Sequence, residues 1–416
     1  MTGLAAAIVI VPFILWKLVR FALAHRGDTS PGTREMALRH FTQEDIDRGK
    51  QCSTPYYLPG LIGYIVEFAF LWALVFLGLA TRIQNLAQAL FSNFILQSGL
   101  FLVIFNLAGG LLLAPLTFYT GYVLGHRLGK LKQTFRQWVW FNLKGLALSF
   151  AVSWAVFWFF LTIVRHFPQA WWFIVAAGIT AFMLVMIFAQ PILLAPIFYK
   201  FTRLDDGPLR DRLLDICRRA GITARDVFVQ HESKVTTQTN AYFTGIGHSK
   251  RIVLYDNLLN SNSHEEVAVV VAHEAGHWAG RHILIGIGLS VVGAFAGSYV
   301  LFRLFQIDAV RQFFGTSAGE PAILPVLSLL GMLISTFFDP IAALISRALE
   351  RRADRASIAL TADPDAFISA HVKLARSNKT DILPHPLLVR LYASHPTALE
   401  RIRFAETPRQ AKHGQA

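Results

Sequence analysis

Cysteine and charge are both scarce in this chain of 416 residues. It contains only two cysteines, Cys52 and Cys217, and this number excludes a disulfide-stapled small domain. Charged residues make up 16% of the sequence, hydrophobic residues make up 54%, and mean hydropathy is +0.45. This composition is too apolar for an ordinary soluble domain, so it indicates a polytopic membrane protein.

Acidic residues are outnumbered by basic residues, and the formal net charge is +13. Nucleic-acid-binding proteins can show this balance, but so can membrane proteins with basic cytoplasmic loops. The high apolar content favours the second class, and we therefore expect no nucleic-acid partner. The sequence also shows no internal repeat and no low-complexity tract.

Seven apolar segments are each long enough to cross a hydrocarbon core of about 30 Å, which needs about 20 helical residues. The first segment lacks the positively charged start of a signal peptide, because the sequence begins with MTGL. Its Ala22-Leu23-Ala24 triplet resembles a cleavage site, so removal of this segment stays open as an alternative. The seven segments cover residues 4–24, 61–81, 94–119, 145–164, 171–198, 283–303 and 321–346.

Lysine and arginine are distributed unequally between the two sides of the predicted membrane region. Four segments that alternate with the spans contain 33 of the 39 basic residues: 25–60, 120–144, 199–282 and 347–416. The positive-inside rule places these segments in the cytoplasm and the N-terminus outside. We therefore expect a multi-pass protein of a bacterial inner membrane or of the endoplasmic reticulum.

The segment 199–282 has the pattern of a small folded unit. An amphipathic helix is predicted over 207–220, and two strands are predicted over 240–247 and 250–259 with a turn at 247–249. The sequence Ser-His-Glu-Glu at 263–266 has the form of a capping box, which predicts that a helix begins at Ser263.

This last helix contains the motif His-Glu-x-x-His. On a helix, His273 and His277 share a face, and two imidazoles on one face can bind zinc. Glu274 lies beside them and can accept a proton from a metal-bound water. The alternative is a pair of surface histidines, although the motif is expected by chance only about 0.01 times in a chain of this composition.

A catalytic zinc needs three protein ligands and one open position. The sequence SRALERRAD at 346–354 directly follows the last predicted span and supplies Glu350 and Asp354 on one helical face. Glu350 is our candidate third ligand, and Asp354 can hydrogen-bond a ligand histidine and fix its tautomer. The alternative for Glu350 is a surface acid that pairs with Arg347 or Arg351.

Two further segments could contact a substrate. His395 could donate a hydrogen bond to the oxyanion of a hydrated amide, with Arg401 following on a predicted helix; the alternative is a turn histidine before a proline. The segment 240–245 could be an edge strand that pairs with an extended peptide, so that Asn240, Ala241 and Tyr242 contact the substrate. A plain hairpin strand is the alternative there.

Several other polar residues are assigned from their position alone. Glu67 and Asp339 fall inside predicted spans, where acidic side chains usually face a bundle interior or a water-filled cavity. His371 lies in a predicted helix and is expected to be packed or exposed. His264 and His282 have no evident role, and we treat them as surface residues.

Four motifs together resemble the type I CAAX prenyl protease family: HEAGHW at 273–278, SRALERRAD, NAYFTG at 240–245 and SHP at 394–396. The resemblance spans nearly the whole chain and includes QTFRQW and KG within 133–145. It implies an integral-membrane zinc metallopeptidase in which seven long helices enclose a large water-filled chamber. It also implies cleavage of the tripeptide that follows a prenylated cysteine in a C-terminal CAAX motif.

The resemblance implies a role for each residue that matches a family motif. By position, it assigns His273, His277 and Glu350 to zinc and Glu274 to catalysis. It assigns Asp354 to hydrogen bonding behind the metal, and it assigns His395 and Asn240 to the substrate or the transition state. Thr397 departs from the family, which tends to have a second proline there.

We therefore expect a mainly α-helical membrane protein with a gluzincin-like α+β peptidase domain at the cytoplasmic side and one zinc ion per chain. Its expected partners are membrane lipid and a peptide or protein substrate; the oligomeric state stays open.

The alternatives are a membrane quality-control protease without prenyl specificity, a metal transporter, and a non-catalytic scaffold. A transporter should hold its metal near the middle of the membrane, whereas these ligands lie at span ends. The predicted regions are 1–198 (membrane helices and a polar linker at 25–60), 199–282 and 347–406 (peptidase parts), 283–346 (membrane hairpin) and 407–416 (disordered tail).

Overall fold

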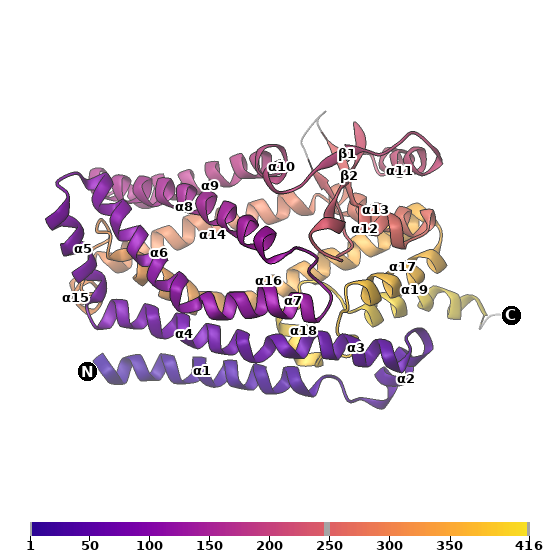
Figure 1. Ribbon diagram of the computed structural model, residues 1–416, viewed down its shortest axis with the longest axis horizontal. Helices are drawn as coiled ribbons and strands as arrows, with labels where there is room; N and C mark the ends of the chain where they lie inside the picture. Colours follow the sequence, from indigo (N-terminus) through magenta and orange to yellow (C-terminus); the bar gives the residue numbers. More distant parts are fainter. Residues whose placement is uncertain (1, 245–249, 414–416) are drawn as a thin grey trace.

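Long, roughly parallel helices dominate the computed structural model, which describes residues 2–244 and 250–413 (Figure 1). Among these residues, six helical stretches are long and apolar enough to cross a membrane. Helix α1 (Thr2–Arg26) coincides with the remaining predicted span. The predicted mainly helical membrane fold is confirmed. The six stretches are built on α4 (Tyr57–Phe76), α6 (Phe94–Phe118), α8 (Phe135–His166), α9 (Trp171–Ala189), α14 (His282–Phe305) and α16 (Ile323–Thr361).

The two ends of the helical bundle differ in content (Figure 1). In the part of the chain that the structure describes, one end has two short helices, α5 (Leu79–Leu90) and α15 (Asp308–Phe314). The other end carries the sheet and the remaining short helices. These are α2 (Pro31–His40), α3 (Gln43–Ser53), α7 (Leu124–Arg127), α10 (Ala195–Phe198), α11 (Pro208–Arg219), α12 (Asp256–Ser261), α13 (His264–Ala279), α17 (Pro364–Ser377), α18 (Pro386–Tyr392) and α19 (Ala398–His413).

The segment 25–60 is predicted to be a polar linker, but the structure folds most of it into α2 and α3. The reason is local, because Thr42 and Asp45 form a capping box in which each side chain accepts a hydrogen bond from the other residue's backbone N–H. Ile46 then packs into a core shared with α17 and α19. These contacts give the segment a fixed position beside the C-terminal helices.

Two boundaries near the C-terminal end also differ from the prediction. The boundary between 346 and 347 falls inside α16, which is one continuous helix of 39 residues. The segment 407–416 is predicted to be disordered, but α19 continues to His413. Its Arg, Gln, Ala and Lys residues are good helix formers, and no glycine interrupts the sequence before position 414.

A four-stranded sheet has the order β1-β2-β4-β3. Strands β2 and β4 are parallel, and the other two pairs are antiparallel, with Ala241 of β3 opposite Leu254 of β4. The predicted strand at 250–259 ends early, because its last residues form α12; the predicted turn at 247–249 lies outside the described residues. The strands are β1 (Phe201–Arg203), β2 (Asp226–Gln230), β3 (Ala241–Thr244) and β4 (Arg251–Tyr255).

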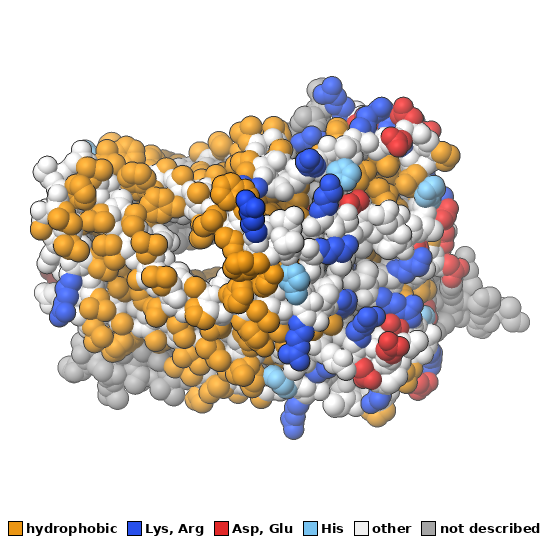
Figure 2. Space-filling view, in the orientation of Figure 1, with side chains coloured by type: hydrophobic (Ala, Val, Ile, Leu, Met, Phe, Trp, Pro, Cys, Tyr) orange, Lys and Arg blue, Asp and Glu red, His pale blue; other side chains and the backbone are white. Residues whose placement is uncertain are grey.

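Side-chain types separate along the length of the molecule. Figure 2 shows hydrophobic side chains covering the long helices around an opening, while Lys, Arg, Asp and Glu gather over the end that carries the sheet. A cavity of about 410 Å³ lies between α4 and α6, and Glu67 is one of its lining residues. An acidic residue of a predicted span therefore faces a cavity.

Candidate metal centre

Helix α13 sets the position of the His-Glu-x-x-His motif. As the sequence predicts, Ser263 is its N-cap and forms a capping box with Glu266. Ten residues later, His273 and His277 lie on the same face, and their Nε2 atoms are 3.1 Å apart. Both rings therefore present one nitrogen to the same point in space.

Helix α16 brings Glu350 to this point. Its Oε2 lies 3.3 Å from His273 Nε2, and its Oε1 lies 3.3 Å from His277 Nε2. The close approach of the two helices depends on Gly276, where a Cβ atom would lie 3.0 Å from Ala353 Cα and 3.1 Å from Ala353 O. The glycine of the motif therefore has a packing role that its spacing alone does not reveal.

The donor atoms of these three side chains fit a zinc ion. All of them lie within 4.8 Å of one another, and the nearest pairs are 3.1–3.3 Å apart. A tetrahedral zinc with nitrogen ligands at about 2.0–2.1 Å separates its donor atoms by about 3.3 Å. Two imidazoles and one carboxylate also leave the open position that a catalytic site needs.

The environment of His273 strongly favours a positive charge. Asp354 Oδ1 lies 2.8 Å from its Nδ1, behind the face that points to Glu350. Burial lowers the pKa of His273, but the hydrogen bonds with Asp354 and Glu350 outweigh burial and raise that pKa to about 9. The same two carboxylates would favour a metal cation at this position.

Glu274 is half-buried beside the two histidines. Its burial raises the pKa of the carboxyl, although the nearby histidines counteract this effect. A carboxylate whose pKa is raised accepts a proton more readily, which suits a general base.

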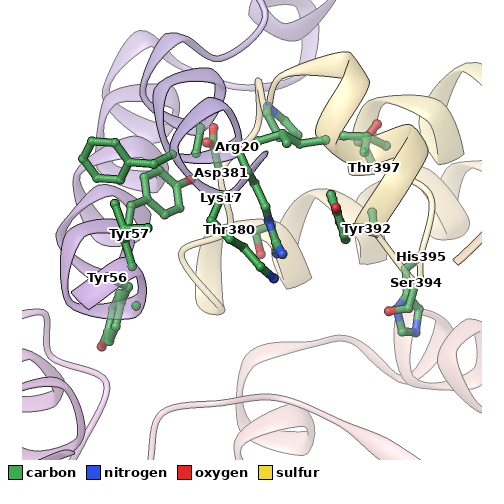
Figure 3. Close-up of a pocket in the computed structure, with 18 of the residues that line it drawn as sticks. Lys17, Arg20, Tyr56, Tyr57, Thr380, Asp381, Tyr392, Ser394, His395 and Thr397 are labelled. Carbon is green, nitrogen blue, oxygen red and sulfur yellow. The ribbon is translucent and has the colours of Figure 1, made fainter. Parts of the chain in front are cut away.

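His395 follows α18 and approaches the same group from another segment. Its Nε2 lies 3.3 Å from Glu350 Oε1, and its Nδ1 lies 2.8 Å from Ser394 Oγ. The side chain is 62% exposed and lines a cavity of about 700 Å³ (Figure 3). The SHP segment is therefore next to the candidate metal ligands and open to a substrate.

Arg401 occupies a different position from the predicted substrate contact. Its side chain is 11% exposed and donates to Glu350 Oε2 at 2.6 Å. It also lies 3.3 Å from Asp354 Oδ1 and 2.9 Å from His371 Nε2. The guanidinium group therefore holds the two carboxylates of α16, and a substrate would reach it only after these contacts changed.

Arg347 does not pair with Glu350, which was one alternative left open by the sequence. It is buried, and it donates to the backbone carbonyls of Val389, Arg390 and Ala393 at the C-terminal end of α18. Among the described residues, neither Arg347 nor Arg351 forms an ion pair with Glu350, whose arginine partner is the largely buried Arg401.

The sequence assigned no role in the centre to two histidines that lie near it, and its interpretation of His282 as a surface residue is wrong. His282 is 6% exposed, and its Nδ1 lies 2.9 Å from His277 Nδ1. His371 is also buried, and burial together with the charge of Arg401 lowers its pKa to about 3. The spacing of five residues after His277 is a weak signal for His282, whereas the position of His371 depends on how α17 and α19 pack.

Strand β3 lies at the edge of the sheet, as one of the two sequence alternatives requires. Ala241 is buried in the core between the sheet and α13, and the Tyr242 hydroxyl donates to Gln230 Oε1 at 2.9 Å. Asn240 is exposed at the start of the strand. Among the described residues, no strand pairs with the other edge of β3, so we expect this edge to be open to another extended chain.

Comparisons with known proteins agree with this geometry. Residues 203–409 match peptidase family M48, and residues 28–200 match the CAAX prenyl protease N-terminal region of five membrane helices. The metalloprotease YhfN of Bacillus subtilis is 30% identical over 85% of this chain and 84% of its own length. CAAX prenyl protease 1 of Saccharomyces cerevisiae is 32% identical over 74% of this chain and 71% of its own length.

A solved structure shows the same fold. The crystal structure of Ste24p from S. mikatae superposes with a TM-score of 0.85 at 25% sequence identity, and the match covers 96% of this chain and 98% of that one. The match includes both the membrane helices and the end that holds His273, His277 and Glu350. The chain therefore belongs to peptidase family M48 and is a multi-pass membrane metalloprotease.

Proposed function

We propose that this protein is a zinc endopeptidase whose metal is held by His273, His277 and Glu350. The observation that carries this proposal is the 3.1–3.3 Å spacing of three donor atoms from two helices, which fits tetrahedral zinc. Bound zinc would polarise the substrate carbonyl and activate a water molecule. The segments 199–282 and 347–406 together form the peptidase unit in this proposal.

The other residues of the centre have separate tasks. Glu274 accepts the proton of the attacking water, since its carboxyl is half-buried and is not among the three converging donors. Asp354 accepts a hydrogen bond from His273 Nδ1 and so directs Nε2 towards the metal. His395 donates to the oxygen that becomes negative during hydrolysis.

The substrate is an extended peptide attached to the membrane. Its backbone pairs with the free edge of β3, so that Asn240, Ala241 and Tyr242 form the first contacts. His273 and His277 lie just before the membrane helix α14, Glu350 lies in the second half of α16, and the cavity beside His395 is lined by Tyr56 and by side chains of α1 and α4. This position suits a peptide with a lipid anchor.

Prenylated CAAX peptides are the substrate class that we propose. The printed name of the yeast relative supports it, while the bacterial relative is named only as a metalloprotease. We place the metal centre on the cytoplasmic side, of a bacterial inner membrane or the endoplasmic reticulum, because the basic segments lie at that end of the molecule.

A cleavage assay with matched peptides tests this proposal. The purified full chain is given a farnesylated CAAX peptide and the same peptide without the farnesyl group, with and without a chelator. We expect chelator-sensitive cleavage with a higher kcat/KM for the farnesylated peptide, and no cleavage by Glu274→Gln. Equal rates would support a membrane protease without prenyl specificity, and chelator-insensitive cleavage would contradict the zinc mechanism.

A further inference from the structure

The cavity beside His395 contains two basic side chains that the proposed chemistry does not use. It has a volume of about 700 Å³ and extends between α1 and the segment 380–398. Figure 3 shows Lys17 and Arg20 extending from α1 into this cavity, while Ser394 and His395 lie on its other side. One wall is therefore positively charged, and the opposite wall belongs to the metal centre.

The Arg20 guanidinium lies 3.9 Å from the centroid of the Tyr392 ring. Stacking of this kind fixes the plane of the guanidinium and leaves its N–H groups available at the edge. Among the described residues, the ion pairs do not include Arg20. Asp381 is the only carboxylate among the described residues that line the cavity, and it lies 3.8 Å from Lys50 Nζ.

The distance from Arg20 to the metal centre suits a short C-terminal peptide. Tyr392, on which Arg20 stacks, precedes His395 by three residues, so their Cα atoms are at most about 11 Å apart. Three extended residues of a substrate span about 10 Å. A peptide cut three residues from its end is therefore long enough to extend from His395 to Arg20, which line the same cavity.

We propose that Arg20, with Lys17 beside it, binds the C-terminal carboxylate of the substrate. A guanidinium can donate two parallel hydrogen bonds to a carboxylate, and this pairing is stronger than one between neutral groups. This contact would select substrates in which the scissile bond lies a fixed number of residues from the C-terminus. The inference rests on the proposed peptidase function and adds a requirement for a free chain end.

Peptides that differ only in a C-terminal carboxylate or amide test this inference on the full chain. We expect kcat/KM for the acid to exceed that for the amide by about 10-fold to 100-fold, as for a hydrogen bond to a charged group. Arg20→Gln should lower kcat/KM for the acid to that for the amide, and Arg20→Lys should keep part of the preference. Arg26→Gln, an exposed arginine further along α1, is the matched control and should keep all of it.

The outcomes separate the carboxylate contact from the peptidase function. Equal cleavage of both peptides by the wild type, or an unchanged preference in Arg20→Gln, would overturn the carboxylate contact while leaving the peptidase function in place. Failure of the wild type to cleave either peptide would overturn both.

His282, which contacts His277, carries a second, independent inference. Its Nδ1 lies 2.9 Å from His277 Nδ1, and the two rings are nearly perpendicular at 85°. His277 directs Nε2 towards His273 and Glu350, so its remaining proton is on Nδ1 and is donated to His282. His282 therefore contacts His277 Nδ1 as a neutral imidazole, in the same way that the Asp354 carboxylate contacts His273 Nδ1.

The conformation of the two residues before His282 allows this contact. Arg281 has φ 53°, a left-handed conformation that turns the chain between α13 and α14. Gly280 leaves room for the ring, because a Cβ atom there would lie 2.4 Å from His282 Nε2. We infer that His282 is a positioning residue that fixes the tautomer and orientation of His277.

Zinc affinity, measured by competition with a chelator, tests this role without relying on activity. We expect His282→Leu to weaken zinc binding about 10-fold to 100-fold. His282→Asn should restore part of the affinity, because its amide oxygen can occupy the position of Nδ1. The exposed His264 is the control, and His264→Ala should leave zinc affinity unchanged.

Gly280→Ala provides a second, independent measurement. It should weaken zinc binding by displacing the ring, yet add nothing in the His282→Ala background, where the displaced ring is absent. Wild-type affinity in His282→Leu, or equal loss in His282→Leu and His282→Asn, would overturn the positioning role. Absence of zinc binding by the wild type would overturn the zinc assignment as well.

Discussion

Glu274 and Glu350 are both carboxylates beside the same histidines, but only Glu350 lies 3.3 Å from both ring nitrogens. We expect Glu274→Gln to keep about one zinc per chain and to lose activity, because a general base is not a ligand. Glu350→Ala should lower zinc occupancy. Asp354→Asn should retain metal with an affinity about 10-fold to 100-fold lower. Metal analysis of the purified variants checks these outcomes, and full occupancy in Glu350→Ala would move the third ligand elsewhere.

His395 should act in the transition state and not in ground-state binding. Loss of one oxyanion donor typically lowers kcat by about 10²-fold to 10³-fold. We therefore expect His395→Ala to keep zinc and KM while kcat falls on that scale, and steady-state kinetics with metal analysis measure all three. A near-normal kcat would reduce His395 to a turn residue, and loss of zinc would make it a ligand.

His371 should make stability depend on pH. Its folded pKa of about 3 lies below the ordinary histidine pKa of about 6.5, so the unfolded chain binds one more proton between these values. Above pH 6.5 the histidine is neutral in both states and does not lower stability. As pH falls from 6.5 towards 3, the free energy of unfolding decreases by about 1.4 kcal/mol per pH unit. Among the groups that face it, Arg401 and His273 lower the pKa further, while Asp354 and the backbone carbonyl of Phe367 counteract the shift.

Thermal unfolding of the wild type and of His371→Gln between pH 7 and pH 5 measures this effect. The Tm of the wild type should decrease more than the Tm of the variant between pH 7 and pH 5. Equal losses would show that other groups cause the acid sensitivity.

The sequence predicted which side chains converge as candidate metal ligands, and it predicted Asp354 behind His273 but not His282 behind His277. His273 and His277 were found because a helical repeat places them on one face, and Glu350 was found because its motif follows a span. His282 could not be recognised as buried, since that depends on the left-handed turn at Arg281. The predicted substrate contact of Arg401 stays a prediction, although the structure directs its side chain to Glu350.

At the scale of elements, Arg347 connects α16 to α18. It donates to three backbone carbonyls immediately before the SHP segment, including that of Val389 at 2.7 Å. A lysine cannot reproduce this planar set of donors. We expect Arg347→Lys to displace His395 and to lower kcat by up to about 10²-fold, with zinc still bound.

The exposed Arg351, one turn further along α16, is the matched control for this change. Arg351→Lys should leave kcat unchanged in the same assay. Zinc loss in Arg347→Lys would show that the arginine supports Glu350 and not the SHP segment.

Helices were easier to predict than short connecting elements. Long apolar runs and the capping box at Ser263 gave α13 and the membrane helices from local sequence alone. Helix α3 begins at a local capping box, but the position of α2 and α3 against the C-terminal helices depends on contacts with distant residues, such as Arg376 with Asp45 at 2.9 Å. Local sequence patterns contain no information about such contacts.

At the scale of the whole molecule, acidic residues within the spans test for a hydrated interior. Glu67 is exposed in α4 and lines a cavity, and Asp339 is exposed in α16. We expect cysteines introduced at both positions to react with a small water-soluble thiol reagent. The native Cys52 and Cys217 are buried and should stay unlabelled. Labelling of the wild-type protein is the control for this expectation.

A cysteine in place of Phe101, which is 0% exposed within α6, should also stay unreactive. Unlabelled cysteines at positions 67 and 339 would count against water inside the bundle. The sequence predicted that these acids face a cavity because a charged group in a membrane needs water or a partner. It could not predict the shape of the cavity, which depends on the packing of all the helices.

Helix α16 runs without interruption for 39 residues, or about 58 Å, and its second half carries Glu350. We therefore expect the order of synthesis to determine when the proposed zinc centre is complete. The ribosome adds His273 and His277 early, but Glu350 follows 73 residues after His277, in the second half of α16. Until the hairpin of α14 and α16 has been inserted into the bilayer, the growing chain would have only two of the three proposed ligands. We expect the nascent chain to be inert towards the other proteins that are being made at the same membrane.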